Sequence, residues 1–343
     1  MIDDPILAFD IGGANIKAAD GLGWVYSEPF ELWRQRHELS ARLEQIVRQR
    51  RPQRVVATMT GEIADCYRSR REGVADIVAA LKHAALSAAR LECPVGIYLV
   101  DGTIVSPEEA VCRPLEAAAS NWHAVARLAA ALATTERAFL IDIGSTTTDI
   151  VPLLNRAPAA MGCDDVTRMV TGELVYTGVE RTPVAAIVRS LPWRGHRRPV
   201  ASELFAQSLD VWLLLGGLAE DADSPQTADG GPATRDAARR RLARMLLVDP
   251  DEITEAEAIV MASWCADRQS RLVAQAVDRV AAAVGCRPQS IVFSGHGECL
   301  ARRAIARLGW DLDCVSLPDL LGGDISRAAP AHALANIARG LLP

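Results

Sequence analysis

The sequence lacks C-x-x-C pairs, long apolar runs and a basic tail. Its eight cysteines are scattered singly, so neither a zinc site nor a dithiol redox motif is expected. The longest apolar stretch, over residues 211–218, is far too short to cross a bilayer. The formal net charge of −6 gives no support for binding to nucleic acid or to an anionic membrane. We therefore expect neither as a partner.

A signal-peptide pattern is missing as well. The chain starts with Asp3 and Asp4 where a basic segment and an apolar stretch would be needed, so we expect a cytoplasmic protein with reduced thiols. What is present is the balance of a globular protein, with 50% apolar and 23% charged residues. A length of 343 residues suits two domains of ordinary size.

Two common phosphate-binding loops are absent. There is no G-x-G-x-x-G running into a helix and no G-K-[ST], which excludes a Rossmann fingerprint and a P-loop. In their place, apolar residues 5–9 lead into Asp10-Ile11-Gly12-Gly13, and an apolar segment resumes at Ile16. This order of strand, glycine turn and strand predicts a β-hairpin.

The same pattern occurs a second time. Residues 138–141 lead into Asp142-Ile143-Gly144, and a returning strand begins at Asp149. We interpret the repeat as an internal duplication, with domains at 1–137 and 138–343. We expect a helical insertion over about 185–285, containing helices at 253–265 and 268–284, and a C-terminal helix from about Ala331 that packs back on the first domain. Strands alternating with helices imply an α/β fold.

Both turns have the chemistry of a phosphate site. A tight glycine turn presents several backbone N–H groups to one anion. Asp10 and Asp142 each end a buried strand, and a buried carboxylate is costly unless it is paired or bound to metal. Their equivalent positions predict one shared divalent cation, Mg²⁺ being the ion that suits carboxylates and phosphates. The alternative is that each aspartate only caps its own turn. The predicted phosphate ligands are Gly12, Gly13, Lys17, Gly144, Ser145, Thr146 and Thr147.

A third glycine turn, Gly295-His296-Gly297, follows a predicted strand over 290–294 and opens a helix over 298–308. A turn of this kind can lie against a nucleotide ring or another flat group. His296 is a candidate for proton transfer, and the alternative is a purely structural histidine. We assign Gly295, His296 and Gly297 to the same phosphate or nucleotide site.

Three segments resemble a known superfamily. Residues 9–13, 141–149 and 293–297 look like the phosphate-1, phosphate-2 and adenosine motifs of the actin-like ATPases, which include sugar kinases and heat-shock proteins. The resemblance implies duplicated ribonuclease-H-like domains with a central cleft between them. The second turn, Asp142-Ile-Gly-Ser-Thr-Thr-Thr-Asp149, is most similar to that of the hydantoinase A and oxoprolinase branch.

A narrower resemblance lies in residues 171–184, which read T-G-E-L-V-Y-T-G-V-E-R-T-P-V. This segment is similar to the signature of the tetrahydromethanopterin-linked one-carbon transfer pathway proteins. Shorter pieces agree with it, at 60–62, 120–122, 202–205, 210–216 and 227–230. The resemblance implies an enzyme of methanofuran-type cofactor biosynthesis. It would condense an aminomethylfuran-methyl diphosphate with a tyramine-type phenol and release pyrophosphate.

That reaction assigns roles to individual residues. The catalytic set is Asp10, Asp142, Asp149 and Glu173, with Asp10 and Asp142 also as metal ligands. Candidates for the base that takes the phenol proton are Glu173, Asp149 and His296. Arg181 would hold the diphosphate, because guanidinium binds phosphate as a fork. The substrate-binding set is Thr60, Gly61, Glu62, Tyr176 and Arg181.

Other functions stay open at this stage. The first is an ATP-dependent small-molecule kinase or a hydantoinase- or oxoprolinase-like amidohydrolase, in which ATP would be the cofactor beside Mg²⁺. The second is a non-catalytic, actin-like nucleotide-binding protein. In the leading reading the partners are a small-molecule diphosphate and an amine or phenol substrate, and a homodimer is an open alternative.

Overall fold

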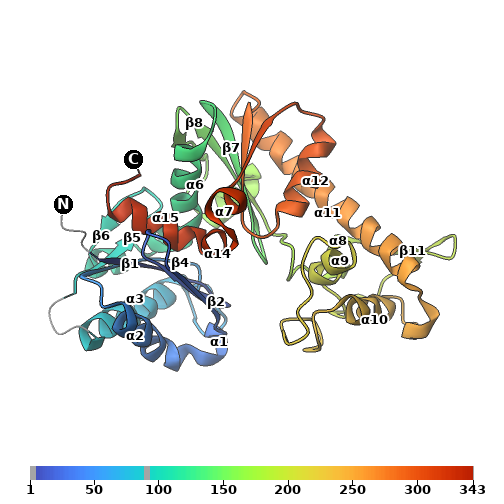
Figure 1. The fold of residues 1–343 in the computed structure, drawn as a ribbon, viewed down its shortest axis with the longest axis horizontal. Helices are drawn as coiled ribbons and strands as arrows, with labels where there is room; N and C mark the ends of the chain where they lie inside the picture. The colour runs from blue at the N-terminus through green and yellow to red at the C-terminus, as the bar shows by residue number, and fades with distance from the viewer. Residues whose placement is uncertain (1–4, 89–92, 343) are drawn as a thin grey trace.

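The computed structural model describes residues 5–88 and 93–342, and two mixed β-sheets dominate it (Figure 1). The first sheet has the strand order β3-β2-β1-β4-β5-β6. Its strands are β1 (Ile6–Ile11), β2 (Asn15–Ala19), β3 (Val25–Pro29), β4 (Arg54–Met59), β5 (Val95–Tyr98) and β6 (Ile104–Val105). The second has the order β10-β8-β7-β13-β14, with β9 paired to β8. Its strands are β7 (Arg137–Ile143), β8 (Thr148–Leu154), β9 (Ala157–Pro158), β10 (Leu174–Val175), β13 (Ser290–Ser294) and β14 (Asp313–Ser316).

The two sheets repeat one topology. β1 pairs antiparallel with β2 and parallel with β4, and β7 pairs in the same way with β8 and β13. In both sheets the aspartate before the turn faces a hydroxyl on the parallel strand, Asp10 beside Thr58 and Asp142 beside Ser294. The fold is therefore a mixed α/β structure with an internal duplication, as the repeated hairpin pattern predicted.

Helices cover both sheets. In the first half they are α1 (Leu32–Gln35), η1 (Arg36–Glu38), α2 (Leu39–Arg50), α3 (Arg70–Ala88), α4 (Pro107–Cys112), α5 (Pro114–Ala117) and α6 (Asn121–Leu132). In the second half, outside the insertion, they are α7 (Asp165–Thr171), α12 (Glu298–Leu308), α13 (Leu317–Leu321), α14 (Gly323–Arg327) and α15 (Ala329–Ala338). None of the helices in the described residues combines the length and apolar composition of a bilayer-spanning segment.

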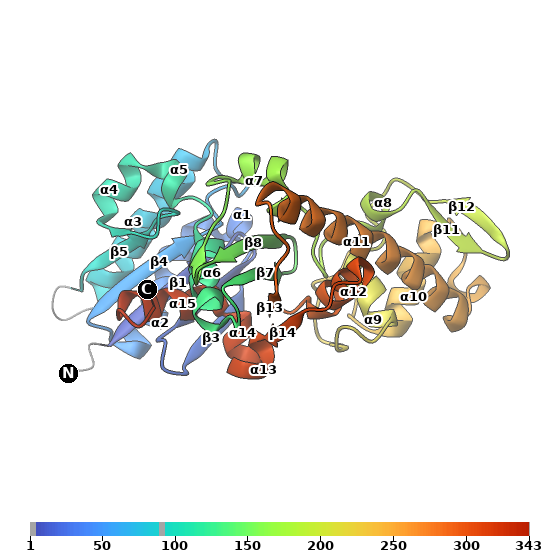
Figure 2. The ribbon, with the colours of Figure 1, turned by 90° about the horizontal axis from the view of Figure 1, so that it is seen from above.

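A shared core joins the sheets through α6 and α15. Buried residues of the first sheet, such as Val56, and of the second, such as Leu140, belong to one apolar cluster with Val125 of α6 and Leu334 of α15. α15 packs against both α6 and β1. Figure 2 shows these two helices side by side between the sheets. We propose that the chain divides into two domains near residue 138, with the C-terminal helix returning to the first.

The segment between β10 and β13 is mainly helical and extends away from the first sheet in both views (Figures 1 and 2). It contains α8 (Val184–Ile187), the hairpin of β11 (Ser190–Trp193) and β12 (His196–Pro199), α9 (Ser208–Leu214), α10 (Arg235–Met245), η2 (Pro250–Glu252) and α11 (Glu255–Ala283). The two helices expected at 253–265 and 268–284 are wrong, because α11 is one helix of 29 residues. Buried positions continue through Cys265, Ala266 and Gln269, so its apolar stripe has no break there.

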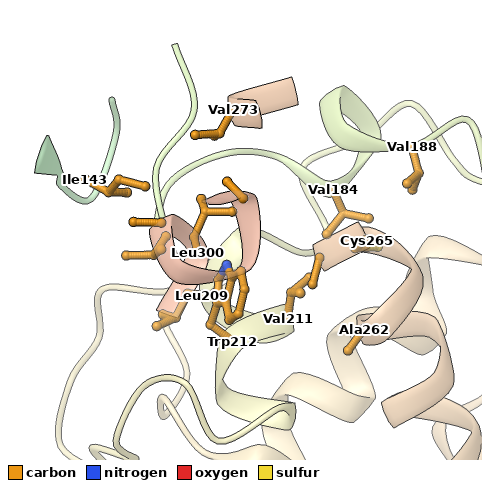
Figure 3. Packing of buried hydrophobic residues seen from close by; sticks show 14 of the residues in the cluster. Ile143, Val184, Val188, Leu209, Val211, Trp212, Ala262, Cys265, Val273 and Leu300 are labelled. Atoms are coloured by element: carbon orange, nitrogen blue, oxygen red, sulfur yellow. The ribbon is translucent and has the colours of Figure 1, made fainter. Parts of the chain in front are cut away.

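The core of this segment reaches the second hairpin. Trp212, Val184 and Cys265 pack in one cluster with Leu300 and with Ile143, the residue that ends β7 (Figure 3). The apolar packing of the insertion therefore supports the strand that carries Asp142.

Candidate functional site at the facing turns

Both glycine turns open into one cavity of about 610 Å³. The residues predicted for the site that line it are Asp10, Gly12, Gly13, Lys17, Thr60, Glu62, Asp142, Gly144, Ser145, Thr146, Thr147, Asp149, Tyr176, Arg181, Gly295 and His296. Gly61, Glu173 and Gly297 are not among the lining residues. Residues from distant parts of the sequence thus meet in one cleft, between the two sheets.

The two turns have the same backbone geometry. The Gly12 N–H donates to the Asn15 carbonyl at 2.9 Å, and the Gly144 N–H donates to the Thr147 carbonyl at 3.0 Å. The repeat extends to the turn after the parallel strand. The N–H of Gly61 donates to the Ile11 carbonyl, and that of Gly297 donates to the Ile143 carbonyl, both at 3.0 Å. Gly61 and Gly297 therefore hold the turns in place from behind.

The residues opposite the two aspartates differ in charge. Asp10 faces Lys17 across the first hairpin, with 4.0 Å between the Lys17 Nζ and the Asp10 Oδ2. Asp142 faces Asp149 across the second hairpin, in the same register. The first turn thus has its own cation, whereas the second places two carboxylates side by side.

Burial controls the protonation of both turn aspartates. It raises the pKa of Asp10, against which the charge of Lys17 acts. Burial, together with the charge of Asp149, raises the pKa of Asp142 to about 6. The Asp10 Oδ1 atom is also buried without a hydrogen-bond partner among the described residues. A buried oxygen of this kind is costly unless a ligand completes its coordination.

Arg168 of α7 supplies the cation that the second hairpin lacks. Its guanidinium lies 2.9 Å from the Asp149 Oδ1 and 3.9 Å from the centre of the Trp122 ring, and only 1% of its side chain is exposed. Burial raises the pKa of Asp149 while Arg168 lowers it. The predicted catalytic role of Asp149 must therefore be compatible with a buried ion pair.

Gly295 lets the third turn approach the second. A Cβ at this position would lie 2.2 Å from the Ile143 carbonyl oxygen and 2.7 Å from the Asp142 Oδ1, and its φ is +77°. Its neighbour His296 has its Nε2 atom 3.1 Å from the Glu180 Oε1. Burial acts to raise the pKa of Glu180. The contact with His296 and the charges of Arg327 and Lys17 act in the opposite direction and outweigh it, so the pKa lies below its usual value.

Glu173, predicted as a catalytic base, lies outside the cavity lining. Its carboxylate is fully buried and accepts hydrogen bonds from the N–H groups of Met161 and Gly162, at 2.7 and 2.8 Å, and from the Thr171 hydroxyl at 2.9 Å. Since both oxygens are occupied by structural donors and the residue does not line the cavity, its prediction as a base is not supported. Glu173 instead fixes the segment that carries α7.

Several cavity residues had not been singled out from the sequence. They are Trp33, Trp122, Asp165, Arg168, Glu180 and Arg327. Arg70 of α3 pairs with Asp165 of α7 at 3.3 Å, and Arg181 lies 5.6 Å from the centre of the Trp33 ring. Each of these contacts joins the first half to the second. Only Trp122 and Glu180 lay within segments noted for their resemblance, and no local pattern marked the others.

The donor set fits a magnesium ion that a substrate completes. Within the described residues, no group of three or more histidine, cysteine, aspartate and glutamate side chains could hold a metal without other ligands. Magnesium commonly takes only one or two carboxylates, and water and phosphate oxygens fill the rest. The orphaned Asp10 oxygen and the Asp142 carboxylate, which line the same cavity, would provide the negative charge for such an ion.

Comparisons with solved structures give two examples. A ROK family glucokinase from Streptomyces griseus, in complex with glucose and AMPPNP, has a TM-score of 0.49 at 12% identity, over 98% of this chain and 99% of that chain. An inorganic polyphosphate/ATP-glucomannokinase from Arthrobacter sp. strain KM has a TM-score of 0.46 at 13% identity, over 98% and 99%.

Two relatives are each named (4-{4-[2-(gamma-L-glutamylamino)ethyl]phenoxymethyl}furan-2-yl)methanamine synthase. The one from Methanocaldococcus jannaschii is 31% identical over 335 residues, which is 97% of each chain. The one from Methanococcus vannielii is 30% identical over 197 residues, 57% of this chain and 87% of that protein. The profile of the hydantoinase/oxoprolinase family matches residues 53–339. The chain therefore belongs to the hydantoinase/oxoprolinase family.

Proposed function

We propose that the protein joins an aminomethylfuran-methyl diphosphate to the phenol oxygen of a tyramine-type acceptor and releases pyrophosphate, in methanofuran-type cofactor biosynthesis. The observation that carries the proposal is the single cavity lined by Asp10, Lys17 and Asp142. The name of the relatives describes a product in which a phenoxymethyl group joins a phenol ring to a furan, and this is the bond that the proposed reaction makes.

The turn end of the cavity suits the diphosphate. Lys17 offers an ammonium there, and Ser145, Thr146 and Thr147 offer hydroxyl and backbone donors. Arg181 is held at the second turn by its backbone, because its main-chain N–H donates to the Ser145 carbonyl at 2.9 Å. These groups would stabilise charge as the diphosphate leaves, and a bound magnesium ion on Asp10 and Asp142 would neutralise part of that charge.

Apolar groups on the cavity wall suit the organic parts of the substrates. Trp33, Trp122 and Ile63 line the cavity, and Tyr176, which also lines it, is 64% exposed. Loss of a diphosphate from a furan-methyl carbon leaves a cation that the ring stabilises. An apolar wall that limits the access of water favours capture by the phenol over hydrolysis.

The test is a reconstitution with purified protein. We expect pyrophosphate and the aryl ether to appear in equal amounts when the furan diphosphate, the tyramine acceptor and Mg²⁺ are all present. Release of pyrophosphate without ether would indicate a hydrolase. No turnover with these substrates, together with turnover of ATP, would overturn the proposal in favour of an ATP-dependent activity.

A further inference from the structure

Glu62 is a buried carboxylate that lines the cavity and has one oxygen without a partner. Only 1% of the residue is exposed, and its Oε2 has no hydrogen-bond partner within the described part of the chain. Among the carboxylates that line the cavity in residues 5–88 and 93–342, only Asp10 shares this property. Such an oxygen is costly to bury unless a ligand meets it.

The duplication provides an internal reference for Glu62. Thr60-Gly61-Glu62 and His296-Gly297-Glu298 occupy equivalent positions, as the matching bonds of the two glycines show. Glu298 has partners for both oxygens, Arg302 at 2.6 Å and Ser316 at 2.7 Å, and does not line the cavity. Of two equivalent glutamates, Glu298 therefore has partners for both oxygens away from the cavity, whereas Glu62 lines the cavity and keeps one oxygen without a partner.

The backbone holds Glu62 in place. Gly73 of α3 packs so closely that a Cβ on it would lie 2.2 Å from the Glu62 carbonyl oxygen. The Gly61 N–H is bonded to Ile11 at the end of β1. A backbone fixed on two sides limits where its side chain can lie before the substrate arrives, which favours a positioned proton acceptor.

The other candidate bases already have partners. Asp149 is paired with Arg168, Glu173 accepts three hydrogen bonds away from the cavity, and His296 lies against Glu180. Asp10 belongs to the turn that would hold the diphosphate.

We propose that Glu62 is the catalytic residue that removes the phenol proton of the acceptor, an assignment that rests on the function proposed above. The phenol oxygen forms a bond to the furan-methyl carbon, and the bond from that carbon to the diphosphate oxygen breaks. The diphosphate leaves with the electron pair, and the phenol proton passes to the free Oε2 of Glu62. The carboxylate ends neutral and returns the proton to water after product release.

The electrostatics of the position agree with this role. Burial raises the pKa of Glu62 to about 7, and the charge of Asp165 on α7 adds to the effect, whereas Arg70 on α3 and the backbone N–H groups of residues 62 and 119 lower it. A base is most useful when its pKa is near the working pH. Because the pKa is raised, the active carboxylate form increases as the pH rises through about 7.

The test compares Glu62→Gln with Glu298→Gln, the same change at the equivalent position. For Glu62→Gln we expect kcat to fall roughly 100- to 10,000-fold, the value that general-base catalysis contributes, with little change in the KM of the furan diphosphate. The wild-type rise of kcat through about pH 7 should disappear. Ring-fluorinated acceptors, whose phenols are more acidic, should recover part of the lost rate in Glu62→Gln. Glu298→Gln should keep both the rate and the pH profile.

A second variant and a second readout keep the test decisive. Glu62→Asp keeps a carboxylate, so kcat should still rise with pH as in the wild type, and its loss of kcat should be smaller than in Glu62→Gln. This variant provides the test if Glu62→Gln does not fold. Infrared difference spectra should show a protonated carboxyl band that titrates near pH 7 in the wild type and Glu298→Gln, and is absent in Glu62→Gln.

The outcomes separate the two proposals. If the wild type forms no ether, the proposed function fails and this inference fails with it. If the wild type forms the ether and Glu62→Gln keeps its kcat and acidic limb, only the assignment of Glu62 is overturned. A rise in KM alone would identify Glu62 as a binding group and also overturn its role as the base.

Discussion

In the first hairpin Asp10 lies opposite Lys17, whereas in the second hairpin Asp142 lies opposite Asp149, at the same register. The two turns are otherwise alike. In each, the N–H of the first glycine after the aspartate, Gly12 or Gly144, donates to the carbonyl three residues later. The duplication has kept the backbone and changed the charge. The first hairpin balances its own aspartate, and the second has an excess of negative charge that other groups must compensate.

Two cations can provide that compensation, the Arg168 guanidinium and a bound divalent ion. Arg168 of α7 neutralises Asp149. Asp142 is left with a raised pKa and a place on the cavity wall, which suits a divalent ion. We therefore propose that a divalent cation would bind mainly at the second hairpin and that the fixed positive charge belongs to the first. The following experiments can break or sharpen this division.

The largest effect is expected for Arg168→Met. The change leaves Asp149 buried without its cation, so the free energy of unfolding should fall by about 3–5 kcal/mol, measured by urea unfolding at pH 7. The matched control is Arg271→Met, which removes an exposed arginine paired with Asp267 on α11 and should cost about 1 kcal/mol or less. Similar losses for the two variants would show that the second hairpin does not depend on Arg168.

Asp142→Asn should have the next largest effect. We expect the rate of pyrophosphate release to fall roughly 100- to 1,000-fold and the magnesium concentration for half-maximal rate to rise, because the variant removes a carboxylate that the ion needs. Asp10→Asn is the equivalent change in the hairpin that has its own lysine, and it should lower the rate of pyrophosphate release by a smaller factor. Equal losses and equal shifts in magnesium dependence would contradict the division between the hairpins.

Gly295→Ala tests how closely the third turn must approach Asp142. The added Cβ meets the Ile143 carbonyl and the Asp142 carboxylate, so thermal unfolding should show a loss of about 1–3 kcal/mol. Gly285→Ala is the control, because its φ of +72° resembles that of Gly295 at +77° while nothing lies within 4 Å of its Cβ. Both variants place an alanine at a positive φ, but only Gly295→Ala also adds a steric clash. Equal losses of stability would show that the close approach of the third turn to Asp142 is unimportant.

Lys17→Met should have the smallest effect of the four. Lys17 is a single, half-buried point charge, so we expect the affinity for magnesium pyrophosphate to weaken about tenfold, or about 1.4 kcal/mol, by calorimetry. Lys82→Met removes a surface lysine paired with Glu108 and should leave the affinity unchanged. An unaltered affinity in Lys17→Met would mean that the lysine serves only to balance Asp10.

Much of the site could be predicted from the sequence because its parts are local. Each turn is specified within a few residues by an apolar strand, an aspartate and small turn residues. The close repetition of the pattern at Asp142 indicated the duplication. The fold class and the meeting of both turns in one cavity followed from that repetition.

The failures have a different origin. Glu173 lay in the most distinctive segment of the chain, yet its side chain points to the backbone of Met161 and Gly162 and not to the cavity. Arg168 lies five residues earlier and carries no motif, but α7 delivers it to Asp149. Periodicity indicates that a helix exists and does not show which distant carboxylate its arginine will reach.

The sequence by itself determined the two hairpins, their aspartates and the lysine that distinguishes them, because hydrogen bonding within a turn depends on neighbouring residues. Only the tertiary structure decided which buried charges have partners. That outcome depends on contacts between segments far apart in the chain, and it separates the saturated Glu173 and Glu298 from the free oxygen of Glu62.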